Sequence, residues 1–333
     1  MAILVTGAAG FIGFHTARAL LAQGEEVVGI DNLNPYYDVR LKEARVDALR
    51  QEHGERFSFR RADFADAEQL NAAVAETDFE SIVHLGAQAG VRHSITDPQS
   101  FVQSNLVGHG NILELARARQ VRHLVYASSS SVYGANSSVP FRVEDRTDQP
   151  MSLYAATKRS NELMSESYAS LYRLPATGLR FFTVYGPWGR PDMAMWLFTR
   201  AILDGEPLRL FNNGEMRRDF TYVDDVVAGV VACLDSPPAD DGRPKAGGSS
   251  TPHALYNIGN HRSEELMRLI ALLEQAIGRK ATIEPLPMQP GDVRETFADI
   301  GAIERDHGFK PRTSIDEGVP RFVDWFKRYH GLA

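Results

Sequence analysis

The first half of the chain alternates short apolar runs with segments of helical periodicity. Runs rich in β-branched residues are typical of buried strands, and we expect strands at 2–6, 26–31, 56–63, 81–87, 123–129 and 176–182. Apolar residues spaced three and four apart predict helices between most of them, for example at 11–23, 98–119 and 153–172. This alternation predicts an α/β fold with a Rossmann-type doubly wound parallel sheet.

The second half is less regular. Helical periodicity predicts helices at 196–205, 225–236 and 264–278. A short apolar run predicts a strand at 254–259 that returns to the main sheet. Residues 236–253 are rich in Pro, Gly and Ser, so we expect a loop or a partly disordered insertion there.

Composition narrows the function classes. The 333 residues are 43% hydrophobic and 24% charged, with a net charge of −7 and no long basic run. This argues against nucleic acid or an anionic membrane as a partner. The single cysteine, Cys233, lies in an apolar run, which predicts a small core residue and suits a reducing compartment. The chain start lacks leader features, and no run approaches the ~20 apolar residues of a membrane span. We therefore expect a cytoplasmic protein.

A glycine-rich turn follows the first predicted strand. In "VTGAAGFIGFH", Gly7 suits a tight turn, Gly10 lets a diphosphate approach the backbone, and Gly13 allows close helix–strand packing. Phe11 and Ile12 begin the following helix, whose first amides favour an anion. The pattern predicts a dinucleotide site, and a plain glycine-rich turn is the alternative.

Two carboxylates follow the second and third predicted strands. Asp31 is placed to accept hydrogen bonds from a ribose, and its charge disfavours a 2′-phosphate. The next residues, Asn32 and Leu33, offer no arginine for such a phosphate, so NAD is favoured over NADP. Asp63 and Phe64 end the third strand, where we expect the adenine edge; for Asp63 the alternative is a turn residue.

A phenol and an ammonium lie one turn apart in "SLYAATKRSNEL". At the ~6 Å spacing of helix neighbours, the Lys158 charge favours the Tyr154 phenolate by about 2–3 kcal/mol at an effective dielectric near ~20. We therefore expect Lys158 to lower the pKa of Tyr154. Hydroxyls from Ser128 to Ser131 lie at the carboxyl end of the strand at 123–129, at the edge where parallel sheets bind ligands. The alternative is a core tyrosine beside a solvated lysine.

Together, the glycine turn, the serine run and Tyr154-x-x-x-Lys158 resemble the short-chain dehydrogenase/reductase superfamily. The segments "LRFFTVYGP", "RRDFTYVDD" and "PGDV" resemble its extended, nucleotide-sugar-modifying branch. Within that branch, "AQAGVRHS", "SLYAATK" and "VYGPWGRPDMA" are most similar to UDP-glucuronate 4-epimerases. The resemblance covers nearly the whole chain except 236–253.

The resemblance implies a reaction and a cofactor. Tyr154 would take the proton of a sugar 4-hydroxyl, Lys158 would hold the nicotinamide ribose, and Ser129 would share the proton transfer. C4 would be inverted through a transient 4-keto sugar, with NAD tightly bound and recycled. Further residues that the resemblance assigns to the cofactor are Leu85, Ala87, Asn105 and Ser128.

A uronic acid substrate brings a hazard, because a 4-keto uronate is a β-keto acid that can lose carbon dioxide. Donors that hold its carboxylate are expected to be Ser130, Ser131, Thr183 and Arg190. A strand-end threonine and a surface ion pair are the alternatives for Thr183 and Arg190. The serine run carries none of the acidic residues that related dehydratases and decarboxylases have there, which favours epimerisation.

The nucleotide end is implied by the resemblance in the same way. Arg218 matches a diphosphate-binding arginine, and Asp292 a residue near the uridine ribose. Phe211 lines the base pocket or belongs to the core. Arg92 faces the sugar or solvent. Gln289 departs from the arginine that many relatives have at that position.

We expect two units: an NAD-binding Rossmann unit of residues 1–183 with about 219–260, and a nucleotide-sugar unit of 184–218 with about 261–333. The principal hypothesis is a UDP-glucuronate 4-epimerase that works as a homodimer without a metal. Alternatives are a UDP-glucose 4-epimerase, another NAD-dependent nucleotide-sugar oxidoreductase or decarboxylase, and a non-catalytic dinucleotide sensor. The resemblance suggests dimer contacts through 98–119 and 153–172, although those apolar faces also suit the core.

Overall fold

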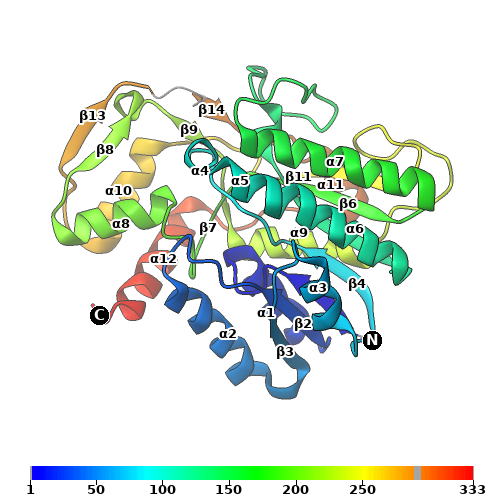
Figure 1. Ribbon diagram of the computed structural model, residues 1–333. Coiled ribbons are helices and arrows are strands. Elements are labelled where there is room, and N and C mark those ends of the chain that lie inside the picture. The colour runs from blue at the N-terminus through cyan, green and yellow to red at the C-terminus, as the bar shows by residue number, and fades with distance from the viewer. Residues whose placement is uncertain (1, 289–293, 333) are drawn as a thin grey trace.

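A seven-stranded parallel sheet forms the centre of the computed structural model (Figure 1), which describes residues 2–288 and 294–332. Its strands in spatial order are β11 (His253–Ile258), β6 (Ala176–Phe181), β5 (His123–Ser129), β4 (Phe79–His84), β1 (Ala2–Thr6), β2 (Val27–Asp31) and β3 (Phe57–Arg61). The chain runs outward from β1 in one direction and then in the other. The predicted doubly wound sheet is therefore confirmed, and its order reverses beside β1, where such sheets bind ligands.

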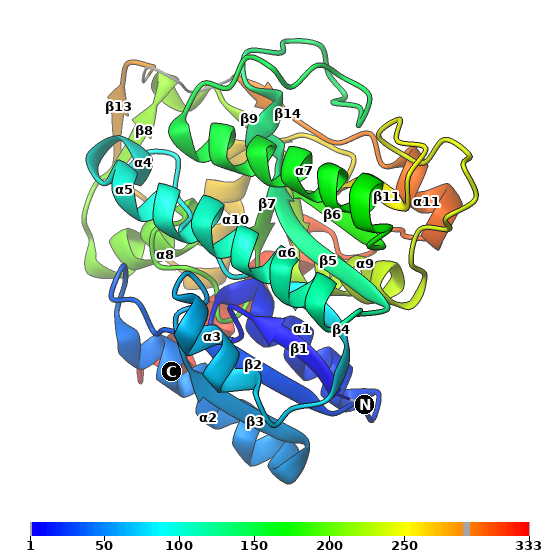
Figure 2. The same cartoon turned by 45° about the vertical axis from the view of Figure 1, so that its right-hand side comes forward.

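Helices cover both faces of this sheet, which explains why its strands read as continuous apolar runs. One face carries α1 (Phe11–Ala22), α2 (Val39–His53) and α9 (Val223–Asp235); the other carries α3 (Ala67–Val74), α6 (Gly108–Ala118) and α7 (Leu153–Tyr172). Figures 1 and 2 both show α6 and α7 side by side across the sheet. A separate apolar cluster fills each face, and Cys233 is buried in that beneath α9.

A third apolar cluster, built around Trp196, Leu269 and Phe322, lies beside the sheet. The elements around it are α8 (Ala194–Asp204), β8 (Leu208–Phe211), η4 (Asn212–Gly214), α10 (Leu266–Ile277), β13 (Ile283–Leu286) and α12 (Ile315–Tyr329). Short pairings join it to the main body through β7 (Thr183–Tyr185), β10 (Phe220–Tyr222), β9 (Arg217–Arg218), β12 (Glu264–Glu265) and β14 (Glu295–Thr296). By contrast, α11 (Gly301–His307) packs on β11 and α9 of the Rossmann sheet.

The helix predicted at 98–119 is interrupted. It consists of α5 (Pro98–Phe101), a π-helical segment η2 (Val102–Val107) and α6, preceded by the short α4 (His93–Thr96). A π turn widens the helix by one residue, a distortion common at functional sites. Here it accompanies the backbone carbonyl of Asn105 accepting a hydrogen bond from Asn161 at 2.6 Å. Short 3₁₀ turns, η1 (Gly54–Arg56) and η3 (Ser130–Tyr133), complete the elements.

Segment 236–253 is a loop tied to the sheet and to α7. Arg173 forms an ion pair with Asp240, and Ser249 donates a hydrogen bond to Glu166 at 2.8 Å. Ala246 is buried, and its carbonyl accepts a bond from Leu255. The loop expectation is therefore confirmed. Within the described chain, none of the helices combines the length and apolar character that a membrane span needs.

Candidate active site

The glycine turn between β1 and α1 is packed so tightly that side chains do not fit. Gly7 has a φ of +70°, and a Cβ there would lie 2.6 Å from the Gly86 amide nitrogen. A Cβ on Gly13 would lie 2.0 Å from the Gly7 carbonyl oxygen. Gly10 caps α1 without a side-chain hydrogen bond, so the amides of Phe11 and Ile12 open the helix unobstructed. The turn fits the diphosphate of a dinucleotide.

Asp31 lies at the end of β2, largely buried. Its Oδ1 accepts a hydrogen bond from the Leu33 amide at 2.8 Å and lies 4.0 Å from the Lys42 ammonium. No sequence motif pointed to Lys42, which α2 brings back to the strand end. Lys42 also donates to the Asn34 carbonyl at 2.9 Å. The carboxylate is thus held in place beside the glycine turn, where a ribose is expected.

The residues at the end of β3 are engaged locally. Asp63 accepts hydrogen bonds from the Ala65 amide at 2.8 Å and from Asn32 Nδ2 at 3.1 Å. The Phe64 ring is buried beneath Gly86 and Gly108, where a Cβ on either glycine would meet it at 2.5 Å. These side chains therefore shape the turn that an adenine would face, and Phe64 contributes to the core.

The loop after β4 is fastened to the π-helical segment. Half-buried Leu85 and Ala87 flank Gly86 in this loop. The Asn105 amide side chain accepts a hydrogen bond from the Gln88 amide at 2.8 Å and donates to the Gln88 carbonyl and to Thr157, each at 3.0 Å. Asn105 thus joins the loop, η2 and α7, and its side chain acts as a bracket between them.

Ser129, Tyr154 and Lys158, called here the Ser–Tyr–Lys group, meet at the carboxyl end of β5. The Ser152 hydroxyl caps α7 by accepting the Ala155 amide at 3.1 Å, which fixes where the helix begins. Tyr154 lies in the first turn of α7, with Ser129 close enough to act on the pKa of its phenol. Lys158 lies one turn further along, with its side chain buried.

The Lys158 ammonium donates a hydrogen bond to the Ala127 carbonyl of β5 at 2.9 Å. The pKa of Tyr154 is raised, because burial outweighs the opposing effects of the Ser129 hydrogen bond and the Arg190 charge. The expectation that Lys158 lowers this pKa is therefore wrong for the protein alone. Helix spacing places two side chains on one face, but Lys158 extends to the strand. Burial also lowers the pKa of Lys158 to about 8.

The serine run divides between two directions. Ser128 is buried and donates a hydrogen bond to Glu162 at 2.6 Å. The Ser128 hydroxyl therefore faces α7. If Ser128 contacts the cofactor as expected, it does so through its backbone. Ser129 Oγ accepts a hydrogen bond from the Ser131 amide at 3.2 Å, which begins η3. Ser130 and Ser131 are half-buried in that turn.

The residues expected to hold a sugar carboxylate lie on two segments. Thr183, half-buried, opens β7, and its amide donates to the Asp219 carbonyl at 3.1 Å. Arg190 pairs with Asp192 through Nε at 3.0 Å, and its charge acts on Tyr154. Tyr36 donates to the same Asp192 at 3.1 Å. The sequence pattern had not singled out Tyr36 or Asp192. The short spacing between Arg190 and an aspartate two residues later was the one feature that could have indicated an ion pair there.

At the nucleotide end of the site, the structure places Arg218, Arg92 and Phe211. Arg218 Nη1 donates to the Arg217 and Arg294 carbonyls at 2.8 and 3.2 Å. The Arg92 guanidinium lies over the Phe211 ring, 4.8 Å from its centre, so this pair joins the loop after β4 to β8. Asp292 and Gln289 lie outside the described residues. Across residues 2–288 and 294–332, no three His, Cys, Asp or Glu side chains gather as metal ligands.

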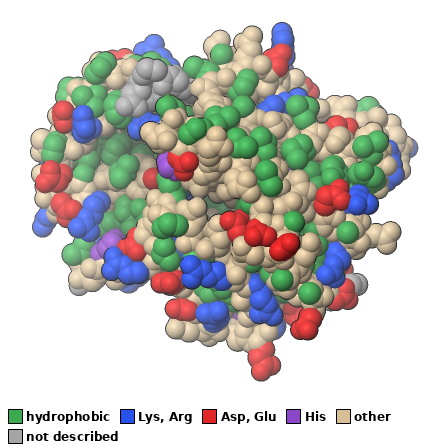
Figure 3. Space-filling view, in the orientation of Figure 1, with side chains coloured by type: hydrophobic (Ala, Val, Ile, Leu, Met, Phe, Trp, Pro, Cys, Tyr) green, Lys and Arg blue, Asp and Glu red, His purple; other side chains and the backbone are tan. Residues whose placement is uncertain are grey.

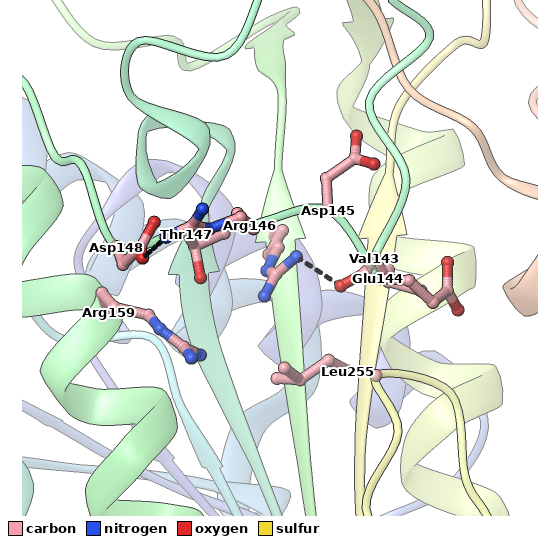
Figure 4. Close-up of a pocket in the computed structure, with 10 residues that line it drawn as sticks. Val143, Glu144, Asp145, Arg146, Thr147, Asp148, Arg159 and Leu255 are labelled. Carbon is pink, nitrogen blue, oxygen red and sulfur yellow. Dashed lines mark hydrogen bonds and ion pairs between the residues drawn. The ribbon is translucent and has the colours of Figure 1, made fainter. Parts of the chain in front are cut away.

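A hollow of about 270 Å³ is lined by Val143–Asp148, Arg159, Arg180, Gly247 and Leu255, and Figure 4 draws the side chains that line it. None of the predicted site residues lines it. Its wall is of mixed charge, with Arg146 paired to Asp148, and Arg180 donates to the Val143 carbonyl at 3.0 Å. This hollow is thus separate from the glycine turn and the Ser–Tyr–Lys group.

The fold and this site define a dinucleotide-binding protein with a Ser–Tyr–Lys group. Residues 3–259 match the model of the NAD dependent epimerase/dehydratase family, and the chain belongs to that family. It is 49% identical over 339 residues to the "Probable UDP-glucuronate 4-epimerase" of Rhizobium meliloti, covering 100% of this chain and 99% of that protein. It is 47% identical over 335 residues to "Protein CapI" of Staphylococcus aureus, covering 99% of each.

A solved structure gives a comparison in three dimensions. UDP-glucuronic acid 4-epimerase from Bacillus cereus, in complex with UDP-glucuronic acid and NAD, superposes with a TM-score of 0.85 at 34% identity. The superposition covers 99% of this chain and 100% of that one. The likeness therefore extends over both the Rossmann sheet and the third apolar cluster.

Proposed function

We propose that the protein inverts C4 of a UDP-hexuronic acid, converting UDP-glucuronate to UDP-galacturonate through a transient 4-keto sugar. The observation that carries the proposal is the placement of Tyr154 beside Ser129 at the carboxyl end of β5, with Lys158 one turn along α7. The glycine turn that fits a dinucleotide lies on β1 of the same sheet. The Rhizobium and Bacillus cereus relatives, named for this reaction, support the substrate.

The chain's own residues would move the proton. Tyr154, deprotonated, takes the proton of the sugar 4-hydroxyl, and Ser129 hydrogen-bonds the 4-oxygen as the C4–O bond becomes a carbonyl. The glycine turn and Asp31 would hold NAD tightly, and the bound cofactor would supply the reversible hydride transfer at C4 that allows either face of the 4-keto sugar to be reduced. Tyr154 then gives its proton back to the 4-oxygen. Lys158 holds the nicotinamide ribose, and the cofactor ends as it began.

The uronate carboxylate must be kept out of alignment with the 4-keto group. We assign this task to Thr183, Ser130, Ser131 and Arg190. Arg190 donates hydrogen bonds to Asp192 through Nε and Nη2. We assign its remaining nitrogen, Nη1, to the carboxylate of the substrate. Charge-assisted bonds of this kind are the strong ones, so the carboxylate is held while the ketone exists.

We assign the nucleotide to the second unit, 184–218 with about 261–333, from which α11 is set apart because it packs on the Rossmann sheet of 1–183 and about 219–260. Arg218 would contact the diphosphate, and Phe211, Asp292 and Arg92 the uridine and sugar. The Arg92–Phe211 contact supports this assignment, because it joins the loop after β4 to β8 of the second unit.

We also propose a cytoplasmic homodimer. Leu163, Leu171 and Tyr172 are exposed on α7, with Val107 on η2. Figure 3 shows hydrophobic side chains gathered over the face that α6 and α7 form. A second copy packed on this face would bury them. A single buried cysteine suits a reducing compartment.

The test is incubation of the purified protein with UDP-glucuronate and UDP-glucose separately, following products by proton NMR and absorbance at 340 nm. We expect UDP-galacturonate without added NAD and without net reduction. Tyr154→Phe is the control and should lose nearly all turnover while retaining NAD. Conversion of the neutral sugar alone contradicts the substrate, and accumulation of NADH with a released keto sugar indicates an oxidoreductase instead.

A further inference from the structure

The buried carboxylate of Glu162 continues the stripe of Tyr154 and Lys158 along α7. Residues four apart on a helix are neighbours on one face, so Glu162 lies one turn beyond Lys158 and two turns beyond Tyr154. It is 1% exposed, and Lys158 is 3% exposed. A carboxylate removed from water to this degree is rare unless several donors satisfy it.

Four donors from three elements surround this carboxylate. Oε1 accepts hydrogen bonds from Ser128 Oγ at 2.6 Å and from Arg180 Nε at 2.8 Å. Oε2 accepts from Arg180 Nη2 at 3.0 Å and from Arg159 Nη1 at 2.8 Å. Glu162 therefore fastens α7 to the ends of β5 and β6, directly beside the strand end that carries Ser129.

Charge balance around Lys158 depends on the same carboxylate. The Glu162 charge raises the pKa of Lys158, opposing the burial that lowers it to about 8. From the other packed elements, His84 on β4 and His109 on α6 face Lys158, and burial lowers the pKa of both far below neutrality. These histidines stay neutral over the working range, so they do not replace the carboxylate.

We propose that Glu162 is a positioning residue for the reaction: it anchors Ser128, which sets the place of Ser129, and it places a buried negative charge one turn of α7 beyond the Lys158 ammonium. The proposal rests on the proposed function, since it assigns Glu162 to the site of that reaction. Glu162 acts through its neighbours and has no contact with substrate in it. A purely structural role would predict changes in stability alone.

The test compares kcat, KM and the pH profile of Glu162→Gln with those of the wild type. Gln keeps the shape of Glu162 and removes its charge, so the pKa of Lys158 falls further. We expect kcat to drop at least tenfold at pH 8 and less at pH 6.5, with KM within twofold. The alkaline limb of the profile should move to lower pH. A Glu162→Gln profile that superimposes on the wild type overturns the proposal.

Three further variants separate position from charge. Ser128→Ala and Glu162→Asp keep the charge, so their alkaline limb should stay in place while kcat falls about threefold to tenfold. The matched control is Glu166→Gln on the same helix, whose carboxylate bonds His253, Ser249 and Thr251. It should lose stability without a change in profile. If Glu162→Gln does not fold, wild-type kcat in both Ser128→Ala and Glu162→Asp overturns the proposal.

The failure of the proposed function has a different signature. NAD affinity is measured by fluorescence titration from pH 6.5 to 9.5 for the wild type and Glu162→Gln. If the wild type converts neither UDP-sugar, the proposed function fails, and this titration still decides the role of Glu162. A weakening of NAD binding that begins at lower pH in Glu162→Gln supports the proposal, and coincident titrations overturn it.

Discussion

Burial governs the acid–base behaviour of single residues in this site. Lys158 is buried and Tyr154 is half-buried, and partial or full removal from water disfavours the charged form of each: it raises the pKa of the phenol and lowers that of the ammonium. Ser129 and Arg190 act against burial at Tyr154. A positively charged ligand beside the phenol would add to their effect, so Tyr154 stays protonated in the protein alone and a bound cation would favour its phenolate.

Thr183→Val tests the residue-level account of the carboxylate. The change removes a hydroxyl donor at the start of β7 and keeps the shape of the side chain. We expect turnover of UDP-glucuronate to fall at least tenfold, because one hydrogen bond to a charged group contributes about 1.5–3 kcal/mol and a tenfold change corresponds to roughly 1.4 kcal/mol. A UDP-pentose product should appear in the proton NMR spectrum, because the 4-keto uronate loses carbon dioxide.

The control is Thr251→Val, which removes a hydroxyl bonded to Glu166 outside the site. It should form no pentose. A Thr183→Val enzyme with wild-type turnover and no pentose would remove Thr183 from the carboxylate site.

At the scale of elements, the contact of β1 with α1 depends on the missing side chain of Gly13. A Cβ there would enter the Gly7 carbonyl, a backbone atom that cannot rotate away. We expect Gly13→Ala to lower the free energy of unfolding by about 1–3 kcal/mol, as overpacking does. It should also weaken NAD binding at least tenfold, measured by fluorescence titration, with stability followed by thermal unfolding.

Gly110→Ala on α6 is the matched control. A Cβ at Gly110 meets only the Met164 methyl at 3.5 Å, an ordinary contact. This variant should bind NAD like the wild type and be equally or slightly more stable, because Ala favours a helix over Gly. Unchanged NAD affinity in Gly13→Ala would contradict the assignment of the turn.

The strands at 2–6 and 123–129 and the helix at 153–172 were predicted to the residue, because buried strands and a capped amphipathic helix carry strong local patterns. The helix at 98–119 was predicted as continuous, since its π segment, η2, has no apolar signature. That segment carries Asn105. The sequence therefore indicated Asn105 as a cofactor residue through the resemblance, but it did not predict the π-helical segment that positions it.

At the scale of the whole molecule, the apolar side chains of Leu163, Leu171 and Tyr172 on α7 are exposed to solvent in the single chain. Leu163→Glu places a charge in the middle of this face, where Leu163 is 55% exposed. If two copies pack through α6 and α7, burying unpaired charges costs several kcal/mol, and the dimer should dissociate. Sedimentation velocity should show a dimer for the wild type and a monomer for Leu163→Glu.

Ile283→Glu, on β13 away from this face and 42% exposed, is the control and should remain a dimer. A wild-type monomer, or a Leu163→Glu dimer, would contradict the assembly proposed for this face.

The sequence by itself determined the order of strands and helices along the chain, the glycine turn and the one-turn spacing of Tyr154 and Lys158. These follow from short-range periodicity and from fixed spacings, which need no knowledge of distant contacts. The choice of Ser129 within the serine run came from the family resemblance. Only the tertiary structure decided which groups the charged side chains contact. Lys158 reaches a β5 carbonyl, Asp192 holds Arg190, and Glu162 gathers donors from β5, β6 and α7. Such contacts join residues distant in the chain, and burial, which sets their pKa values, exists only once the elements have packed.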